Sequence, residues 1–423
     1  MMKILIMSIG TRGNMEPFLA IAEMLKAKGH EVICAFPEQF RTLAEETGVK
    51  FISLGPEFID LINSDIGKLA IGGKEPSIRK TRAILDVFKK GAPIQAALIE
   101  RQHDIVEKEK PDKILFNVIP FNAKVIYPLL WGIKNSAGVI LVSPVLCIIH
   151  YVKGRPNAGF TRNYGAVINK FTFDAVNFDY VSMFLKTADK YFKDLCLNRK
   201  QILNALLSLK CIYTVSPAVF PRPDYWPPNA TVLGYQERDK TLNWTPDPEL
   251  AGFTERHDKI LFVTFGSMPN PDPMKMTNMF VGILEKHNIP AILNLSGGGI
   301  TEPPQYNKDL IKFTPYIPYN WICPKVYGVI QHGGAGTTQC ALKHGCVTMV
   351  IPHITEQPVW NNIVYKLGVG PKGIAASKLS KEKLEPKILD LWTNASYKKR
   401  AMEISDQMKH EDYTDELYKA IME

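Results

Sequence analysis

Apolar and polar residues alternate along the chain in blocks that predict two successive runs of strands and helices. Near the start, residues 4–9 are apolar and predict a strand, residues 10–14 a turn, and residues 17–28 a helix with apolar positions at helical spacing. Residues 31–36 follow as a second strand and complete a β-α-β unit. Later strands are expected at residues 113–118 and 138–143, which are nearly continuous in apolar side chains, as in parallel sheets.

A second run of the same kind follows a proline-rich stretch. Five prolines between residues 217 and 228 indicate a stiff linker. Beyond it, strands are expected at residues 260–265, 291–295, 311–316, 328–330 and 348–351, and helices at residues 274–287, 338–344 and 360–367. We therefore predict an α/β protein. Its predicted parts are an N-terminal Rossmann-like domain (residues 1–216), a linker (217–240), a second Rossmann-like domain (241–396) and C-terminal helices (397–423).

Composition narrows the class of protein and of partner. At 423 residues, 46% of them hydrophobic and 22% charged, the chain fits a globular protein of two domains. A net charge of +9 favours anionic partners such as nucleotides or acidic lipids, although a merely basic surface is the plainer interpretation. The seven cysteines are scattered and indicate no disulfide framework. Residues 136–152 lack charge but are too short to span a membrane, so we expect a cytoplasmic protein.

Two glycine-bearing turns, at residues 10–13 and 333–336, each follow a predicted strand and precede a predicted helix. Small residues let the backbone approach an anion, and the first N–H groups of a helix have no internal partner. Both turns would lie at the carboxyl ends of parallel strands, where ligands bind, and could face each other across a cleft. Neither turn matches the dinucleotide or P-loop fingerprint, and no residue spacing indicates a metal site.

Three segments carry a resemblance to a known family. They are Gly-Thr-Arg-Gly-Asn-Met-Glu-Pro-Phe at residues 10–18, His-Gly-Gly-Ala-Gly-Thr-Thr at 332–338 and Glu-Gln-Pro-Val-Trp at 356–360. In this order they resemble the UDP-dependent glycosyltransferases of family 1, in the bacterial and fungal branch of the sterol and antibiotic (macrolide) glycosyltransferases. The resemblance implies a GT-B fold, with two Rossmann-like domains and parallel sheets facing across a cleft. It also implies inverting, metal-independent sugar transfer from a UDP-sugar, a co-substrate that needs no cofactor.

The resemblance also implies where the donor binds. The donor-binding residues would be Gly266, Ser267, Trp321, His332, Gly333, Gly334, Gly336, Thr337, Thr338, Glu356 and Gln357. The Gly-Ser pair would border the diphosphate, the tryptophan the uracil, and the histidine would hydrogen-bond a diphosphate oxygen. The threonines would add hydroxyl donors, and the Glu-Gln pair would hold sugar hydroxyls. Core packing is the alternative for the tryptophan, and an acid at a helix start is the alternative for the Glu-Gln pair.

The N-terminal turn departs from the family's pattern. The residues of this turn that would reach the cleft are Thr11, Arg12 and Gly13. The branch has an Asp as catalytic base, whereas Asn14 occupies that slot here, and an amide cannot accept a proton at neutral pH. Asn14 could be an engineered Asp-to-Asn change, or a natural residue with Glu16 or His150 as substitute base or an acidic phenol as acceptor. The chain could also bind without fast turnover, as a UDP-sugar or lipid-binding protein. A nucleotide-sugar epimerase is a further alternative.

The acceptor would bind to the N-terminal domain. Its aromatic-rich stretch comprises residues 145–152, Phe160, Tyr164, Phe171, Phe173, Phe178, Tyr180 and Phe184. A flat apolar acceptor such as a sterol, triterpenoid, flavonoid, macrolide or other lipid would suit it, and ordinary core is an equal alternative. Residues 68–90 mix Lys and Arg with apolar residues, which predicts either a solvated helix or a peripheral contact with the inner membrane surface. Nucleic acid is not expected as a partner, and the oligomeric state is open.

Overall fold

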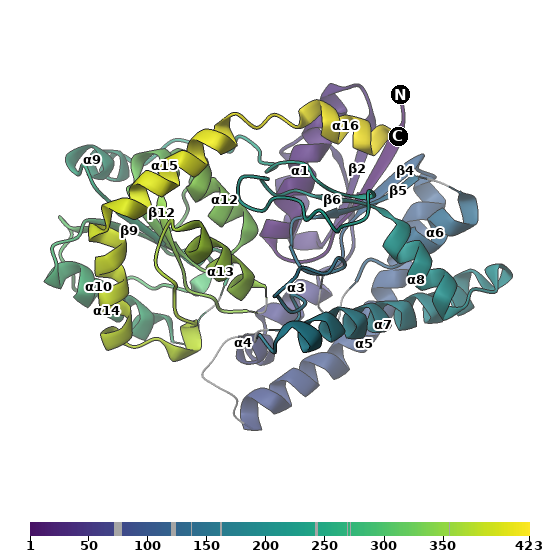
Figure 1. Ribbon diagram of the computed structural model, residues 1–423, viewed down its shortest axis with the longest axis horizontal. Helices are drawn as coiled ribbons and strands as arrows, with labels where there is room; N and C mark the ends of the chain where they lie inside the picture. The colour runs from purple at the N-terminus through teal and green to yellow at the C-terminus, as the bar shows by residue number, and fades with distance from the viewer. Residues whose placement is uncertain are drawn as a thin grey trace.

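The structure is a computed structural model. It describes residues 1–71, 78–119, 124–136, 138–160, 163–241, 244–268, 270, 272–354 and 356–423. Two parallel sheets with helices on both faces form two α/β domains (Figure 1), which confirms the predicted fold class.

The first sheet has the order β3-β2-β1-β4-β5-β6-β7 and the second the order β10-β9-β8-β11-β12. The first sheet contains β1 (Lys3–Met7), β2 (Glu31–Phe36), β3 (Lys50–Ser53), β4 (Lys113–Phe116), β5 (Gly138–Ser143), β6 (Lys210–Tyr213) and β7 (Ala230–Val232). The second contains β8 (Leu261–Thr264), β9 (Ala291–Asn294), β10 (Ile311–Thr314), β11 (Gly328–Gln331) and β12 (Val347–Val350). Strand order reverses beside β1 and beside β8, and such switch points open a crevice at the carboxyl ends of the strands.

The α-helices of the N-terminal half are α1 (Arg12–Ala27), α2 (Arg41–Glu45), α3 (Glu57–Asn63), α4 (Asp65–Ile71), α5 (Ile78–Glu109), α6 (Tyr127–Asn135), α7 (Ala166–Tyr191) and α8 (Arg199–Ser208). Those of the C-terminal half are α9 (Pro248–Arg256), α10 (Pro273–Lys286), α11 (Tyr319–Ile322), α12 (Ala335–Lys343), α13 (Gln357–Leu367), α14 (Lys381–Thr393), α15 (Ala395–Lys409) and α16 (Thr414–Met422).

Strand β1 shows how the sheet separates two cores. Ile4 and Ile6 face the layer that contains α1 and α16, whereas Leu5 and Met7 face the layer of α5 to α8. All four side chains are fully buried. Because successive side chains of a strand point to opposite faces, a continuous apolar run is what a sheet covered on both sides requires.

Helix α1 begins earlier than the sequence pattern predicts. We expected a turn through residue 14 and a helix from Pro17, but the helix starts at Arg12 and Pro17 lies inside it. Pro17 is the sixth residue of the helix, so its ring removes the N–H that would bond to the Gly13 carbonyl oxygen, and the helix continues past this missing hydrogen bond. The correction matters because it places Asn14 in the first turn of the helix.

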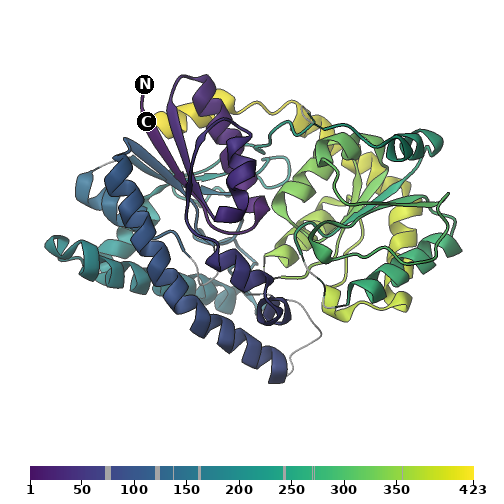
Figure 2. The same ribbon diagram turned by 180° about the vertical axis from the view of Figure 1, so that it is seen from behind.

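The segment predicted as the linker, 217–240, contributes to the N-terminal domain. Its strand β7 pairs with β6 and extends the first sheet. The chain also returns to that domain at its end, where Lys113 Nζ donates to the carbonyl oxygens of Ile421 and Met422 at the end of α16. Figures 1 and 2 accordingly show both termini close together, with α16 beside α1. Of the basic segment 68–90, residues 72–77 with Lys74 lie outside the described residues.

Candidate functional site

The glycine turn after β11 is built around the His332 side chain. A Cβ added to Gly334 would lie 2.5 Å from His332 Nε2, and one added to Gly266 would lie 2.9 Å from His332 Cε1. The imidazole is therefore lodged between two backbone segments, one from each of two neighbouring strands, that only glycine lets approach so closely. This arrangement brings three of the predicted donor residues together at the start of α12.

His332 is buried and neutral. Burial, with a smaller effect of the nearby His353, lowers the pKa of His332 to about 3. Its Nδ1 atom is buried and has no hydrogen-bond partner among the described residues. A neutral imidazole at a helix N-terminus can still donate one N–H to an anion.

Gln331 and Thr338 hold the turn in shape. The Gly333 N–H donates to Gln331 Oε1 at 2.5 Å, and Gln331 Nε2 donates to Thr338 Oγ1 at 2.8 Å. The Thr338 hydroxyl in turn donates to the Gly334 carbonyl oxygen at 2.8 Å, and its side chain is fully buried. The Thr338 proton is thus committed to the turn in this structure, and its predicted role as a hydroxyl donor to the diphosphate stays a prediction. Thr337 is also buried.

A second histidine, which the sequence analysis did not select, faces the same region. His353 Nδ1–H donates to the Ile351 carbonyl oxygen at 2.8 Å, which leaves the buried Nε2 as an acceptor with no partner among the described residues. Burial lowers the pKa of His353 to about 4. The sequence does contain a signal for this histidine. The Ile-Pro pair that precedes it marks the end of a strand and so places residue 353 at the carboxyl end of β12.

Glu356 and Gln357 stand at the start of α13, but they differ in what they offer. Gln357 Oε1 already accepts the backbone N–H groups of His353 and Ile354, at 2.6 and 3.0 Å. Its NH2 group is thus the part that could contact a sugar. Glu356 is partly buried, and burial raises its pKa to about 7. The carboxyl group therefore changes charge near neutral pH.

Trp321 and Ser267 occupy the outer part of the site. The Trp321 ring lies 5.1 Å from the Trp244 ring in an edge-on arrangement, and Lys325 Nζ lies 5.1 Å from its centroid. Trp321 is partly exposed and Ser267 is exposed at the end of β8. Nearby, the Tyr319 and Thr264 hydroxyl groups are 2.8 Å apart and join α11 to β8. Trp321 thus belongs to a half-open aromatic pair and not to the closed core.

The N-terminal turn presents Asn14 instead of a carboxylate. The Asn14 side chain packs over Gly10, and its Oδ1 atom is buried with no partner among the described residues. The turn itself is held by Asn117, whose side chain bonds both the N–H and the carbonyl oxygen of Ile9, at 3.1 and 3.0 Å. α1 and α12 pack side by side (Figures 1 and 2), so the two glycine turns belong to helices that contact each other across the two domains.

Glu16 does not have the character of a base. Its carboxylate lies 2.9 Å from Arg12, 3.1 Å from Arg238 and 3.4 Å from Lys240. Although burial alone would raise the pKa of Glu16, the charges of Lys240, Arg238 and Arg12 hold it below the ordinary value. A carboxylate held in its charged form is a weak proton acceptor, and the predicted role of Glu16 as substitute base stays a prediction. The cluster instead ties α1 to the segment between the domains, and Arg12 also lies over the Tyr316 ring of the second domain.

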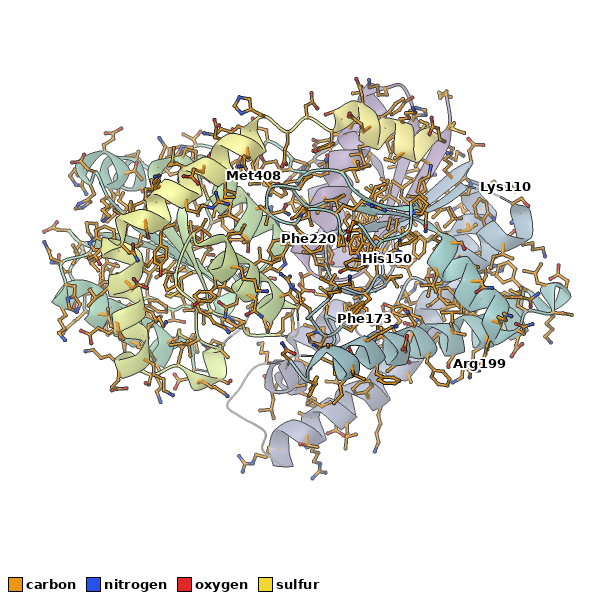
Figure 3. The ribbon with its side chains drawn as sticks, viewed as in Figure 1. Lys110, His150, Phe173, Arg199, Phe220 and Met408 are labelled. Carbon is orange, nitrogen blue, oxygen red and sulfur yellow. The ribbon has the colours of Figure 1, made fainter. Side chains whose placement is uncertain are left out.

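His150 lies in the loop after β5, as Figure 3 shows near the centre of the molecule. Its Nδ1 is 2.9 Å from the Tyr213 hydroxyl group, and its buried Nε2 has no partner within the described ranges. Burial and Arg222 lower the pKa of His150 to about 4. The contacts of His150 within the part of the chain that the structure describes are with Tyr213 and Trp226, and not with Asn14. His150 therefore keeps an available nitrogen, but without a demonstrated link to the Asn14 slot.

The aromatic stretch predicted to bind the acceptor divides between core and surface. Phe173, Tyr180 and Phe184 are buried in the core of the N-terminal domain, whereas Phe171 and Phe178 are exposed on α7. Residues 145–152 form a loop that is largely buried in the same core. The stretch as a whole is thus not one pocket, and only its loop after β5 lies at a carboxyl end of the sheet.

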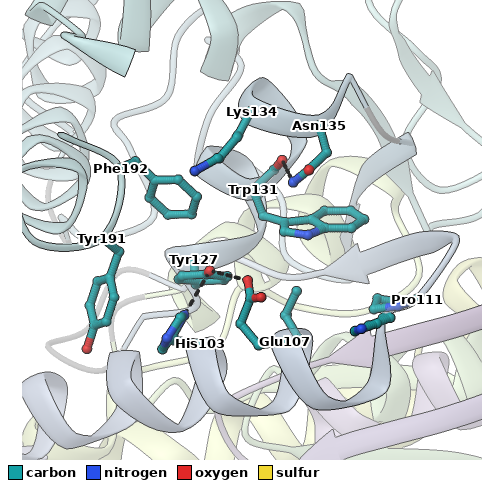
Figure 4. Close-up of a pocket in the computed structure, with 11 residues that line it drawn as sticks. His103, Glu107, Pro111, Tyr127, Trp131, Lys134, Asn135, Tyr191 and Phe192 are labelled. Atoms are coloured by element: carbon teal, nitrogen blue, oxygen red, sulfur yellow. Dashed lines mark hydrogen bonds between the residues drawn. The ribbon is translucent and has the colours of Figure 1, made fainter. Parts of the chain in front are cut away.

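A pocket of about 520 Å³ lies elsewhere, between α5, α6 and the end of α7 (Figure 4). The Tyr127 hydroxyl group joins His103 Nδ1, at 2.9 Å, to Glu107 Oε1, at 3.1 Å, across its floor. None of the predicted site residues lines it. Within the described residues, no cluster of three or more His, Cys, Asp or Glu is placed to hold a metal ion. No helix in those ranges is long and apolar enough to cross a bilayer.

Two family models match the chain, and each contains one of the two glycine turns. The glycosyltransferase family 28 N-terminal domain matches residues 4–110. The C-terminal domain of the erythromycin biosynthesis protein CIII-like proteins matches residues 305–423.

Curated relatives align with almost the whole chain. A sterol 3-beta-glucosyltransferase of Arabidopsis thaliana is 28% identical over 428 residues, covering 97% of this chain and 64% of the relative. The O-mycaminosyltylonolide 6-deoxyallosyltransferase of Streptomyces fradiae is 23% identical over 430 residues, covering 97% and 94%. The chain thus spans somewhat under two thirds of the Arabidopsis protein and nearly all of the Streptomyces one.

Solved structures with the same architecture are glycosyltransferases. The glycotransferase of kitacinnamycin superposes with a TM-score of 0.69 at 15% identity, over 99% of both chains. The calicheamicin glycosyltransferase CalG4 also gives 0.69, at 14% identity, over 99% of this chain and 98% of the other. These likenesses identify the fold as GT-B. The family models and the curated relatives show that the sequence is similar to the family 1 glycosyltransferases of the sterol and macrolide branch.

Proposed function

We propose that the protein transfers a sugar, with glucose favoured, from a UDP-sugar to a hydroxyl group of a small apolar acceptor. The transfer would invert the anomeric carbon and use no metal. The observation that carries the proposal is the neutral His332 held between Gly266 and Gly334 at the N-terminus of α12. A sterol, triterpenoid, flavonoid, macrolide or lipid would serve as acceptor, and a peripheral contact with the inner membrane surface would bring the enzyme to acceptors that dissolve poorly in water.

In this proposal the diphosphate binds where α12 begins. The acceptor oxygen forms a bond to the anomeric carbon while the bond from that carbon to the diphosphate oxygen breaks, and UDP leaves. Backbone N–H groups of the turn and one N–H of His332 would spread the charge that develops on UDP. Because they are already positioned by Gln331 and Thr338, little reorganisation is needed during the reaction.

Fewer residues of the site can be assigned to binding the sugar and to accepting the acceptor proton. Glu356 would accept hydrogen bonds from sugar hydroxyls, with the NH2 group of Gln357 and the bare Nε2 of His353 beside it. The acceptor proton has no carboxylate to receive it in the Asn14 slot. The amide oxygen of Asn14 can hold the acceptor hydroxyl by a hydrogen bond, and His150 is the remaining candidate for the proton.

The Asn14 slot favours a second candidate function, a protein that binds a UDP-sugar or a lipid without fast transfer. An epimerase that acts on the nucleotide sugar alone is less favoured, because the ion-paired Glu16 is not available as an acid on the N-terminal side. A mass-spectrometric screen of donors and acceptors separates the three. A glycosylated acceptor supports the transferase, an altered sugar without acceptor supports the epimerase, and neither product supports the binding protein.

Calorimetry tests the donor site directly. We expect heat with UDP and with UDP-glucose for the wild-type chain and for the control variant His410→Ala, whose histidine follows the end of α15 and is 78% exposed. His332→Ala should bind the donor about tenfold to a hundredfold more weakly, since a hydrogen bond to a charged group contributes about 1.5–3 kcal/mol. No heat with either ligand, or an unchanged affinity in His332→Ala, would contradict the proposal.

A further inference from the structure

The N-terminal halves of α5 and α7 expose large apolar side chains to solvent. On α7, Val167, Phe171 and Phe178 are 71%, 64% and 61% exposed, and on α5, Leu85 and Phe88 are 57% and 58% exposed. Residues four and seven positions apart on a helix lie on one face, as do residues three apart. Each helix therefore presents an apolar row. We call these five residues the α5–α7 apolar surface.

Both rows belong to one region of the N-terminal domain. The His103 ring of α5 contacts the Tyr191 ring of α7 at 4.7 Å. Nearer the N-terminal ends of both helices, Lys124 links them, because its N–H donates to Gln95 of α5 and its Nζ binds Asp179 of α7. The helices thus run in the same direction, as Figure 1 shows, and their N-terminal halves lie at the same end of the domain, with α5 reaching the edge of the molecule.

Cationic side chains accompany the apolar rows. Residues 78–90 and 166–178 together contain six Lys or Arg residues and two acidic ones, Asp86 and Asp174. The Arg199 guanidinium, labelled in Figure 3, lies 4.3 Å from the Phe178 ring centroid. Aromatic and aliphatic side chains surrounded by cations match the boundary between anionic headgroups and acyl chains of a bilayer. Large apolar side chains that stay exposed in one region of a domain indicate an interaction surface.

We propose that the α5–α7 apolar surface docks onto an anionic membrane. The apolar rows would enter the headgroup boundary while the Lys and Arg side chains lie over lipid phosphates. The docking itself does not depend on the proposed function. Only its purpose rests on that function, because an apolar acceptor partitions into the bilayer, beside the domain that would bind it. It extends the contact predicted for residues 68–90, since α7 supplies three of the five residues.

Vesicle sedimentation tests the docking surface with the protein alone, in the absence of donor and acceptor. We expect binding to vesicles with about one third phosphatidylglycerol in phosphatidylcholine, weaker binding to phosphatidylcholine alone, and release at high salt. The double variants Phe171→Ser/Phe178→Ser and Leu85→Ser/Phe88→Ser should each bind about tenfold more weakly. Tyr365→Ser is the matched control, because Tyr365 is 54% exposed on α13 of the other domain.

Unchanged vesicle binding in both double variants, with circular dichroism showing that they are folded, would overturn the proposal. Equal loss of binding in the Tyr365→Ser control would do the same, because binding would then not be local to this surface. If light scattering shows a dimer that the double variants dissociate, and vesicles do not bind, the surface pairs with a second copy and the membrane proposal is wrong. These outcomes can be interpreted even if the protein transfers no sugar, because none of the measurements depends on transfer.

Discussion

The two glycine turns are built from the same elements, but they differ in which of their polar side chains are held by partners. Each follows a central strand beside a switch point and opens a helix, α1 in one domain and α12 in the other. At the α12 turn, Gln331 and Thr338 are joined in a hydrogen-bond network, and His332 is held between two glycines. The turn at α1 instead carries the amide of Asn14, whose buried oxygen has no partner among the described residues, and the carboxylate of Glu16, which is paired with cations.

The difference between the two turns concerns two separate tasks, binding of the diphosphate and removal of the acceptor proton. A diphosphate needs N–H donors, which a helix start and a neutral histidine supply by themselves. Removing a proton from an acceptor needs a group whose pKa suits the task, and a backbone cannot supply that. Binding can therefore be complete on the α12 side while chemistry stays slow on the α1 side.

The largest expected effect comes from giving the α1 turn a base. Asn14→Asp should raise the rate of sugar transfer by roughly 10²–10⁴-fold, the usual contribution of a positioned general base. The rate is measured with UDP-glucose and any acceptor that the screen identifies. Asn135→Asp, the same change at an exposed position on α6, should leave the rate unchanged. An unchanged rate in Asn14→Asp would exclude this residue as the missing base and shift attention to His150.

The next effect comes from disturbing the α12 turn without touching a side chain of the site. Gly334→Ala places a Cβ 2.5 Å from His332 Nε2, so the imidazole must move away from the donor. We expect UDP-glucose affinity, measured by calorimetry, to fall about tenfold to a hundredfold, as for loss of a charge-assisted hydrogen bond. Gly282→Ala, on α10 and outside the predicted donor site, is the matched control, because its nearest neighbour lies 3.6 Å away. Equal affinities in the two variants would show that the position of His332 does not matter.

Much of the α12 side was predictable from the sequence, and little of the α1 side was. His332, Gly333 and Gly334 are contiguous, and a strand followed by glycines and a helix has one common geometry, so the pattern was sufficient. Glu16, in contrast, looked like a free acid because its partners Arg238 and Lys240 are more than two hundred positions away in the chain. Local patterns do not reveal ion pairs formed by tertiary packing.

The aromatic stretch illustrates the same limit. Phe171 and Phe173 are two positions apart and identical in type, yet one is on the surface and the other in the core. Helical phase decides between them, and phase depends on where α7 begins and on what packs against it. His353 was missed for a related reason: a histidine after a strand has no distinctive spacing, and its role depends on the Ile351 carbonyl that orients its ring.

The smallest effect concerns the sugar end of the α12 side. Because burial raises the pKa of Glu356 to about 7, this carboxyl is largely protonated at pH 6 and ionised at pH 8. His332 and His353, with pKa values near 3 and 4, stay neutral across that range. An ionised carboxylate accepts stronger hydrogen bonds from sugar hydroxyls, by about 1 kcal/mol or roughly fivefold in affinity. UDP-glucose should therefore bind more tightly as pH rises from 6 to 8.

The matched variant Glu356→Gln removes this titration while keeping the shape of the side chain. UDP-glucose is the right ligand for the measurement, because its phosphates do not titrate near neutral pH, unlike the terminal phosphate of free UDP, whose pKa is about 6. A flat calorimetric profile in Glu356→Gln beside a rising one in the wild type would assign the pH dependence to this carboxyl. If both rise together, the titrating group lies elsewhere, and the α12 side would be no more complete at its sugar end than the α1 side is at Asn14.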